Sequence, residues 1–100
     1  MLPPLVTPET GRAARAAALA VPGVAGLDPG RFGEVAILLP GARIEGIRPS
    51  ERGGLRGLEA HLVFDVSSGR DVRSVAEEAR SAIAGATGAD YVDVVVSDAQ

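Results

Sequence analysis

The strongest constraint in this sequence is a strand–helix–strand pattern that fills residues 55–98. The segment 55–66 (LRGLEAHLVFDV) alternates apolar with polar residues, as does a strand with one buried face. An amphipathic helical segment follows, and residues 91–98 (YVDVVVSD) have the composition of another strand. A helix that links two strands of one sheet forms a right-handed crossover. The pattern therefore predicts a helix packed against a sheet.

Capping residues mark both ends of this second predicted helix. Asp71 or Ser68 can cap its first turn, and Gly88 stands where a left-handed C-terminal cap belongs. Apolar residues recur between the caps at the i, i+3, i+4 and i+7 spacing of a buried helical stripe. The expected stripe consists of Val72, Val75, Ala76, Ala79, Ala82, Ile83 and Ala86.

The first predicted helix begins at Thr7-Pro8-Glu9 and extends to about Ala20. Thr is favoured at the N-cap, Pro at the first helical position, and Glu near the positive end of the helix dipole. The expected core face consists of Ala13, Ala14, Ala17 and Val21. Such a face packs closely but buries little apolar area, so the helix needs further anchoring.

A connection without polar side chains, AVPGVAGL, follows the first helix. We expect Pro22 to end the helix, Gly23 to adopt a positive φ, and Gly26 to allow a close approach. Val24 and Leu27 would then fold back under the helix end, where burial of each adds about 1.5–3 kcal/mol. The predicted structural turn consists of Val21, Pro22, Gly23, Val24, Gly26 and Leu27.

Two shorter strands are expected between the turn and residue 55. Residues 34–40 form a short apolar run, and residues 42–48 form a second strand with a bulge or bend at Gly46. Residues 49–54 (PSERGG) are expected to form a flexible loop. The short connections favour an antiparallel meander leading into the strand at 55–66.

These elements predict an α/β (α+β) fold in the order α-β-β-β-α-β. Each helix has one apolar stripe and one sheet face is apolar, which favours a two-layer sandwich. We expect a mixed four-stranded sheet with both helices on one face. Residues 7–98 form a single domain in this interpretation, and residues 1–6 form an irregular N-terminal tail.

Composition argues against several function classes. The 100 residues carry a net charge of −3 and no cysteine, so a disulfide framework or a thiolate site is excluded. Basic residues are scattered and no Lys is present, so we expect no nucleic-acid partner. No apolar run approaches the roughly 20 residues that span a bilayer, and no signal peptide precedes the domain. We therefore expect a cytoplasmic protein without direct membrane insertion.

The sequence contains no recognisable catalytic motif. His61 is the single histidine, and the carboxylates expected near it on the open sheet face are typical of a solvated surface. These carboxylates are Glu45, Glu59, Asp65 and Asp93. No dinucleotide or P-loop fingerprint is present. We expect no catalytic residues, no cofactor and no metal site.

Apolar residues that alternation assigns to the open sheet face are candidates for an interaction surface. If the helices cover the opposite face, these residues form an apolar patch with a polar rim. The candidate interaction face consists of Leu38, Ile47, Val63, Tyr91 and Val95. Self-association or binding of an anchor protein would use this face or an adjacent sheet edge.

Two short motifs resemble a known family. Val21-Pro22-Gly23-Val24 with Gly26-Leu27 ends the first helix, and Ala86-Thr87-Gly88 precedes the last strand. Over residues 8–98 the chain resembles the alkaline shock protein family, the Asp/Gls-type envelope stress response proteins of Gram-positive bacteria. The resemblance implies a non-enzymatic cytoplasmic protein that associates with itself or a paralogue. It also implies recruitment to the membrane by a small anchor protein, in support of envelope integrity.

Two other function classes remain open at this stage. One is a small ligand-binding regulatory domain of ferredoxin-like build, which would sense a metabolite at a helix–sheet edge. The other is an accessory subunit of a larger enzyme.

Overall fold

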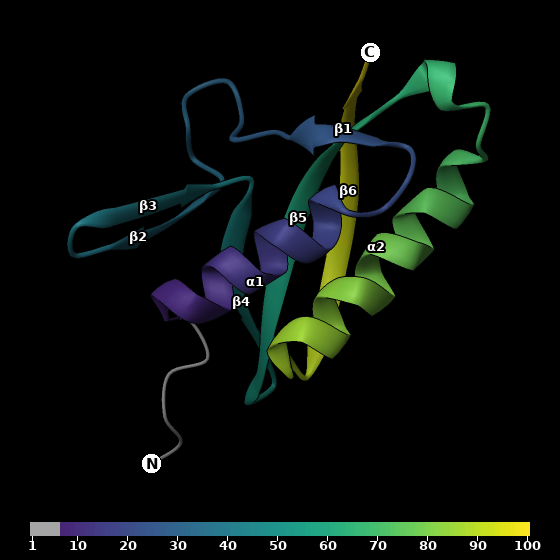
Figure 1. The fold of residues 1–100 in the computed structure, drawn as a ribbon. Helices are drawn as coiled ribbons and strands as arrows, with labels where there is room; N and C mark the ends of the chain where they lie inside the picture. Colours follow the sequence, from purple (N-terminus) through teal and green to yellow (C-terminus); the bar gives the residue numbers. More distant parts are fainter. Residues whose placement is uncertain (1–6) are drawn as a thin grey trace.

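The computed structural model describes residues 7–100, so the tail predicted for residues 1–6 lies outside the described part. Figure 1 shows two helices packed against one side of a sheet, with a hairpin projecting beside it. The elements are α1 (Pro8–Leu19), β1 (Val24–Leu27), β2 (Ala36–Leu39), β3 (Ala42–Glu45), β4 (Ile47–Arg52), β5 (Leu55–Phe64), a 3₁₀ turn (Val66–Ser68), α2 (Val72–Thr87) and β6 (Tyr91–Ala99). The predicted α+β class is confirmed.

Strand β5 is the centre of the mixed four-stranded sheet. Strand β6 pairs with one side of β5 in parallel, and α2 connects the two as predicted. Strands β4 and β1 lie end to end along the other side of β5, both antiparallel to it. They meet at His61, whose N–H donates to the carbonyl of Gly46 and whose carbonyl accepts from the N–H of Asp28, each at 2.9 Å.

The predicted meander is wrong in its boundaries. Strands β2 and β3 form a separate antiparallel hairpin, so the predicted strand at 34–40 lies outside the main sheet. Gly46, at φ 85°, turns the chain out of the hairpin into β4, and the predicted strand 42–48 is divided there. This positive φ explains the division, because glycine adopts it without the steric cost other residues would meet.

The loop predicted for residues 49–54 is also wrong. Residues 49–52 continue β4 and pair with β5, which leaves only Gly53 and Gly54 to make the turn. Pro49 is compatible with a strand here because its backbone nitrogen points away from β5. No hydrogen bond to β5 requires an N–H at this residue.

The apolar connection after α1 folds mostly as predicted. Val21 is buried, and Val24 and Leu27 pack against the core. Gly23 has φ 100°, and a Cβ at this position would lie 2.6 Å from Cγ2 of Val75. The connection differs from the prediction in forming β1. Gly26 is not the site of a close approach, because a Cβ there would have no atom within 4 Å.

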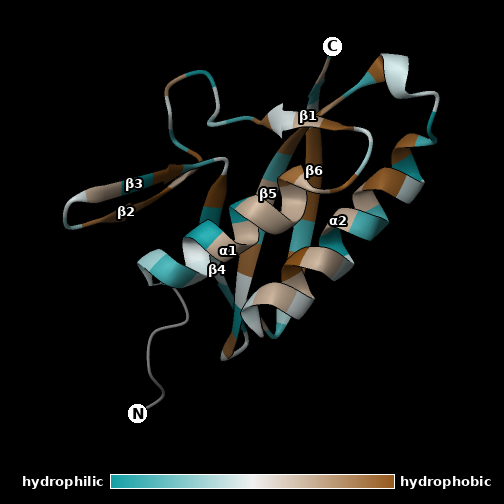
Figure 2. Cartoon of the chain, viewed as in Figure 1, coloured by the Kyte–Doolittle hydropathy of each residue, from teal (hydrophilic) through white to brown (hydrophobic). Residues whose placement is uncertain are grey.

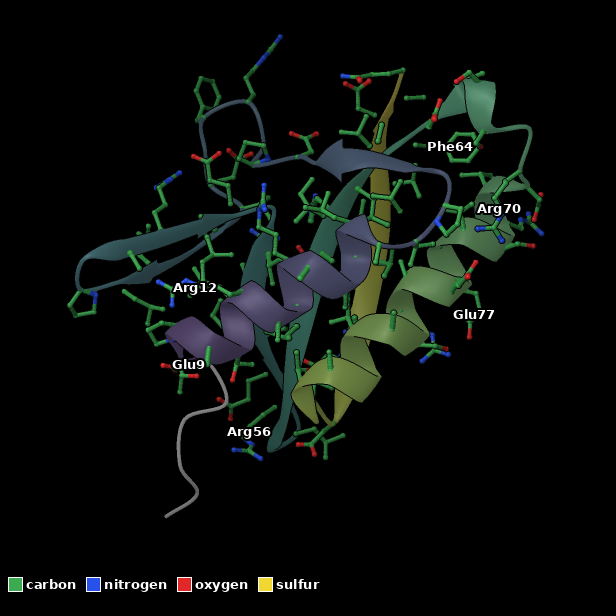
Figure 3. All side chains as sticks on the ribbon, in the orientation of Figure 1. Glu9, Arg12, Arg56, Phe64, Arg70 and Glu77 are labelled. Atoms are coloured by element: carbon green, nitrogen blue, oxygen red, sulfur yellow. The ribbon has the colours of Figure 1, made fainter. Side chains whose placement is uncertain are left out.

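The core lies between the helices and one face of β5. Leu58, Ala60 and Leu62 alternate along β5 and are buried on that face. Figure 2 shows apolar residues on the strands beneath the helices and along the hairpin. The buried helix positions are Gly11, Ala14 and Ala18 in α1, and Val75, Ala79 and Ile83 in α2. Figure 3 shows Arg12 and Glu77 pointing away from the body of the molecule.

The two helical stripes differ from the predicted ones at particular positions. In α1, Gly11 and Ala18 are buried while Ala13 is half-buried, because α1 also packs on the hairpin. A Cβ at Gly11 would overlap the side chain of Ile44 in β3. In α2, Val72 and Ala86 are exposed because they lie in the terminal turns, beyond the contact with the sheet.

The predicted helix caps are confirmed. The Thr7 side chain accepts a hydrogen bond from the N–H of Thr10, and the Asp71 side chain accepts one from the N–H of Ser74. Gly88 closes α2 in the left-handed region at φ 71°. These caps supply partners for backbone groups that the helix ends leave unbonded.

Candidate functional site

Of the five residues predicted to form an apolar patch, two lie away from the open face. Leu38 lies on the hairpin, 70% exposed, and Ile47 is fully buried in the core beneath the helices. Val63 is on the open face but only 9% exposed, while Tyr91 and Val95 share that face. The prediction is wrong for Ile47 because the turn at Gly46 starts a new strand whose register sets Ile47 opposite the buried Ala60.

The open face instead carries a polar cluster centred on Glu59. Arg48, on β4, donates to Oε2 of Glu59 from Nε at 2.7 Å and from Nη2 at 2.6 Å. Nε2 of His61, two residues further along β5, lies 2.7 Å from the same oxygen. Both His61 and Glu59 are largely covered, with side-chain exposures of 17% and 22%. The histidine is therefore held as a partner of a carboxylate that an arginine already neutralises.

The environment of Glu59 favours its ionised form. The hydrogen bond from His61 lowers the pKa of Glu59, and Arg48 lowers it further, while partial burial opposes both effects. A carboxylate with a lowered pKa and filled hydrogen bonds is a poor proton carrier near neutral pH. This arrangement is suited to joining β4 to β5 through their side chains.

Tyr91 covers the lower part of the open face. Its ring lies where a Cβ on Gly57 would be, so it crosses β5 at that glycine. Its hydroxyl lies 2.6 Å from Oγ of Ser50 on β4, and Arg52 stacks over the ring at 4.5 Å from the centroid. Nη2 of Arg52 also donates to Asp93 at 2.6 Å, and this hydrogen bond raises the pKa of Arg52. The side chains of β4 and β6 thus meet across the centre strand.

The upper part of the open face is crossed by a second bridge. Oγ of Ser97, on β6, donates to Oδ2 of Asp28 at 2.7 Å, and Asp28 directly follows β1. This bond is the main cause of a lowered pKa at Asp28. Val63, which pairs with Gly26 of β1 and Asp98 of β6, lies between the bridged strands. The bridge and the close flanking strands account for the burial of Val63.

The carboxylates expected on this face separate into two groups. Glu59 and Asp93 are register neighbours on the open face, and each is bound to an arginine of β4. Glu45 pairs with Arg43 on the hairpin, and Asp65 caps the 3₁₀ turn. Within residues 7–100, no group of three potential ligands is arranged to hold a metal ion.

The arginine side of this cluster is absent from the predicted face because residues 49–54 were expected to form a loop. Arg48, Ser50 and Arg52 repeat at intervals of two, which is the spacing of one strand face. That alternation was a usable signal, but Pro49 and the two glycines that follow β4 indicated a turn. A strand that tolerates Pro49 must be at a sheet edge.

The two edges of the main sheet differ in their capacity to pair. On β4, the backbone groups of Ile47, Pro49 and Glu51 point away from β5, because Arg48, Ser50 and Arg52 lie at the positions bonded to β5. Pro49 has no N–H, so it interrupts that edge near its middle. This edge is a poor template for another strand.

The β6 edge contains no proline, and its pairing with β5 shifts register once, at Ser97. His61 directs its backbone groups to Gly46 and Asp28, so the even-numbered residues of β5 bond to β6. In the parallel register that pairs Leu58 with Val92, those bonds go to Tyr91, Asp93 and Val95. Alternation directs the backbone groups of Val92, Val94 and Val96 outward, and no strand of residues 7–100 pairs with them. The neighbouring side chains of Val95 and Val96 are 39% and 37% exposed. Open backbone groups beside exposed valines form a surface that another strand can extend.

Other exposed apolar side chains are scattered. Phe32, in the loop after β1, is 88% exposed, and Leu38 is on the separate hairpin. No described helix is both long enough and apolar enough to cross a membrane. Comparison of the chain with protein-family models, with curated proteins and with solved structures gives no match.

Proposed function

We propose that this chain is a non-enzymatic interaction and scaffold protein that self-associates. The single observation that carries the proposal is the contrast between the two sheet edges, with β4 interrupted by Pro49 and the outer side of β6 unpaired along the regular stretch 91–96. An open strand edge is a template for another strand, and natural monomers usually protect such edges with charges, prolines or bulges. Here the register shift of β6 lies at Ser97, and the stretch from Val94 to Val96 before it is without charge or proline.

The chemistry of the open face supports a binding role over catalysis. Glu59 and Asp93 are each bound to an arginine, and His61 is bound to Glu59. A general acid or base needs a pKa near the working pH and access to a substrate proton. A carboxylic acid needs a raised pKa to act as a general acid at neutral pH, whereas the pKa of Glu59 is lowered.

The resemblance to the alkaline shock protein family gives the proposal its cellular setting. In that setting the protein works in the cytoplasm and supports envelope integrity. A small membrane-anchored partner recruits it, and copies or paralogues assemble around that anchor. The regulatory-domain and accessory-subunit alternatives lack a comparable structural observation in their favour.

Light scattering coupled to size exclusion, over a concentration series at moderate salt, tests the self-association. We expect the average mass to rise with concentration above that of the 10.1 kDa chain. A mass equal to one chain at every concentration would contradict self-association and move weight to the ligand-binding or accessory-subunit alternatives.

A further inference from the structure

We infer that the outer edge of β6 pairs with β6 of a second copy, antiparallel, about a two-fold axis at Val94. This inference rests on the proposed self-association and specifies its geometry. The pairing uses only residues 92–96, which lie in regular register with β5 and end before the register shift at Ser97. The two copies would form one continuous sheet with four strands from each.

The backbone groups that need partners on this edge are those of Val92, Val94 and Val96. In the parallel register with β5, the intervening residues Asp93 and Val95 direct their N–H and C=O groups toward β5. The groups of the three valines point away from it, and no strand of residues 7–100 pairs with them. The available donors and acceptors are therefore distributed evenly on both sides of Val94.

The number of hydrogen bonds selects the axis. Two residues directly opposite each other in an antiparallel pair exchange both bonds only where each directs its groups outward. An axis at Val94 sets Val94 opposite its copy and Val92 opposite Val96, so all three outward residues of each copy are paired. An axis at Asp93 leaves Val96 without such a partner, and an axis at Val95 does the same to Val92. The axis at Val94 is therefore the one that uses every open group of the regular stretch.

Charge supports the same register. An axis at Asp93 would place two Asp93 carboxylates opposite each other at a position without hydrogen bonds, where opposed side chains are closest. With the axis at Val94, Asp93 lies opposite Val95 instead, and no two carboxylates are opposed within residues 92–96. Asp98 would reach the level of Asp90 only beyond the register shift, outside the paired stretch.

The side chains of the paired stretch add apolar contacts. On the helix-covered face, Val94 would meet its copy and Val96 would meet Val92. Val94 already packs against the core, whereas Val96 is 37% exposed. Cross-strand pairs of β-branched residues stabilise a sheet. Pairing would therefore bury apolar surface that the edge leaves exposed at Val96.

Closure favours a second copy over an extended peptide of another protein. A peptide added to β6 would present its own outer edge, whereas two-fold pairing uses the open edge of both copies. The combined sheet would end on each side at β4, where Pro49 supplies no N–H, and at the four-residue strand β1. The assembly built through this edge is therefore a closed dimer. Larger assemblies would need a different surface.

Single cysteines test the axis directly, because the sequence has no cysteine of its own. With the axis at Val94, Asp93 lies opposite Val95 of the second copy at a position without hydrogen bonds. The Cα atoms of such a pair are about 4.5 Å apart, a separation that a disulfide can bridge. An equimolar mixture of Asp93→Cys and Val95→Cys in a glutathione redox buffer should therefore give mainly the mixed disulfide dimer, identified by mass spectrometry.

The other products of this mixture have definite meanings. A homodimer of either variant as the main product would move the axis to that residue and overturn its assignment to Val94. Glu51→Cys, on the β4 edge, is the matched control and should give no disulfide dimer under the same conditions. A Glu51→Cys dimer as abundant as the mixed dimer would overturn the choice of the β6 edge.

Edge prolines provide the second test, also with a matched control. Val96→Pro removes an outward N–H from each copy without removing a bond to β5. It should weaken dimerisation at least about tenfold, measured by sedimentation velocity. Glu51→Pro makes the same change on the β4 edge and should leave the dimer unchanged. Circular dichroism verifies that both variants are folded. If folded Val96→Pro dimerises as the parent does, the edge assignment is wrong while the proposed self-association stands.

Amide hydrogen exchange of the parent separates the possible occupants. In the dimer, the amides of Val92, Val94 and Val96 should exchange more slowly as concentration rises, while those of Asp93 and Val95 change little because they are bonded to β5. A parent that stays monomeric, with rapid exchange at the three valine amides, overturns both the inference and the self-association. The edge would then be open to a strand of another protein.

Discussion

The two faces of the central sheet are stabilised by different interactions, which alternate residues of β5 make. On the covered face of β5, Leu58, Ala60 and Leu62 are buried beneath the helices. On the open face, Gly57 and Glu59 contact polar and aromatic side chains from the neighbouring strands. Apolar burial requires no directed partner and gains with area, whereas exposed ion pairs and hydrogen bonds gain little over water. Substitutions on the covered face should therefore cost more.

The largest difference in the free energy of unfolding is expected between substitutions of Ile47 and of Leu38. Ile47→Ala leaves a cavity in the covered core and should lower the free energy of unfolding by about 2–5 kcal/mol. Leu38→Ala, at a position 70% exposed on the hairpin, should change it by less than about 0.5 kcal/mol. Urea denaturation measures both. Similar costs for the two variants would contradict the placement of Ile47 in the core.

Gly57 tests how far the open face depends on the Tyr91 ring. A Cβ on Gly57 overlaps the ring, so Gly57→Ala must displace it from Ser50 and Arg52. We expect a loss of about 1–3 kcal/mol in the free energy of unfolding. In a Tyr91→Ala background the same substitution should cost much less, because the obstacle is gone. Additive losses in a double-mutant cycle would rule out the overlap as the cause.

Glu59 gives the open face a pH dependence that the covered face lacks. The pKa of Glu59 is lowered from an ordinary value of 4.5, so its stabilising effect is present above that value and is lost as pH falls through the lowered pKa. Glu59→Gln should be less stable than the parent by about 1 kcal/mol at neutral pH. The difference should shrink as the pH falls below the ordinary value of 4.5 and through the lowered pKa. Urea titrations at several pH values measure it, and a constant difference would refute the linkage.

The smallest effect on the open face is expected at the Tyr91 hydroxyl. Tyr91→Phe keeps the ring over Gly57 and the stacking with Arg52 but removes the bond to Ser50. Because this bond is only partly buried, the loss should be about 0.5 kcal/mol. Thermal unfolding of Tyr91→Phe beside Ser50→Ala measures it. A loss as large as that of Gly57→Ala would mean that the hydroxyl, not the ring position, secures this face.

The predictable part of the fold is the part where local and tertiary signals agree. The caps at Thr7, Asp71 and Gly88 and the alternation along 55–66 are local properties, and the structure confirms them. The candidate face was predicted less well. Its residues depend on register, and the positive φ at Gly46 changed which face Ile47 occupies. A single break in a strand is enough to reassign every side chain beyond it.

The sequence by itself determined the helix boundaries, the crossover between β5 and β6, and the α+β class, because periodicity and capping act within short segments. Only the tertiary structure decided that β1 and β4 share one edge of β5, that the hairpin leaves the main sheet, and that the open face is polar. Those features depend on pairing between segments distant in sequence, such as Arg52 with Asp93 and Asp28 with Ser97. The open β6 edge belongs to the second group, because an edge exists only after every other strand has found its partner.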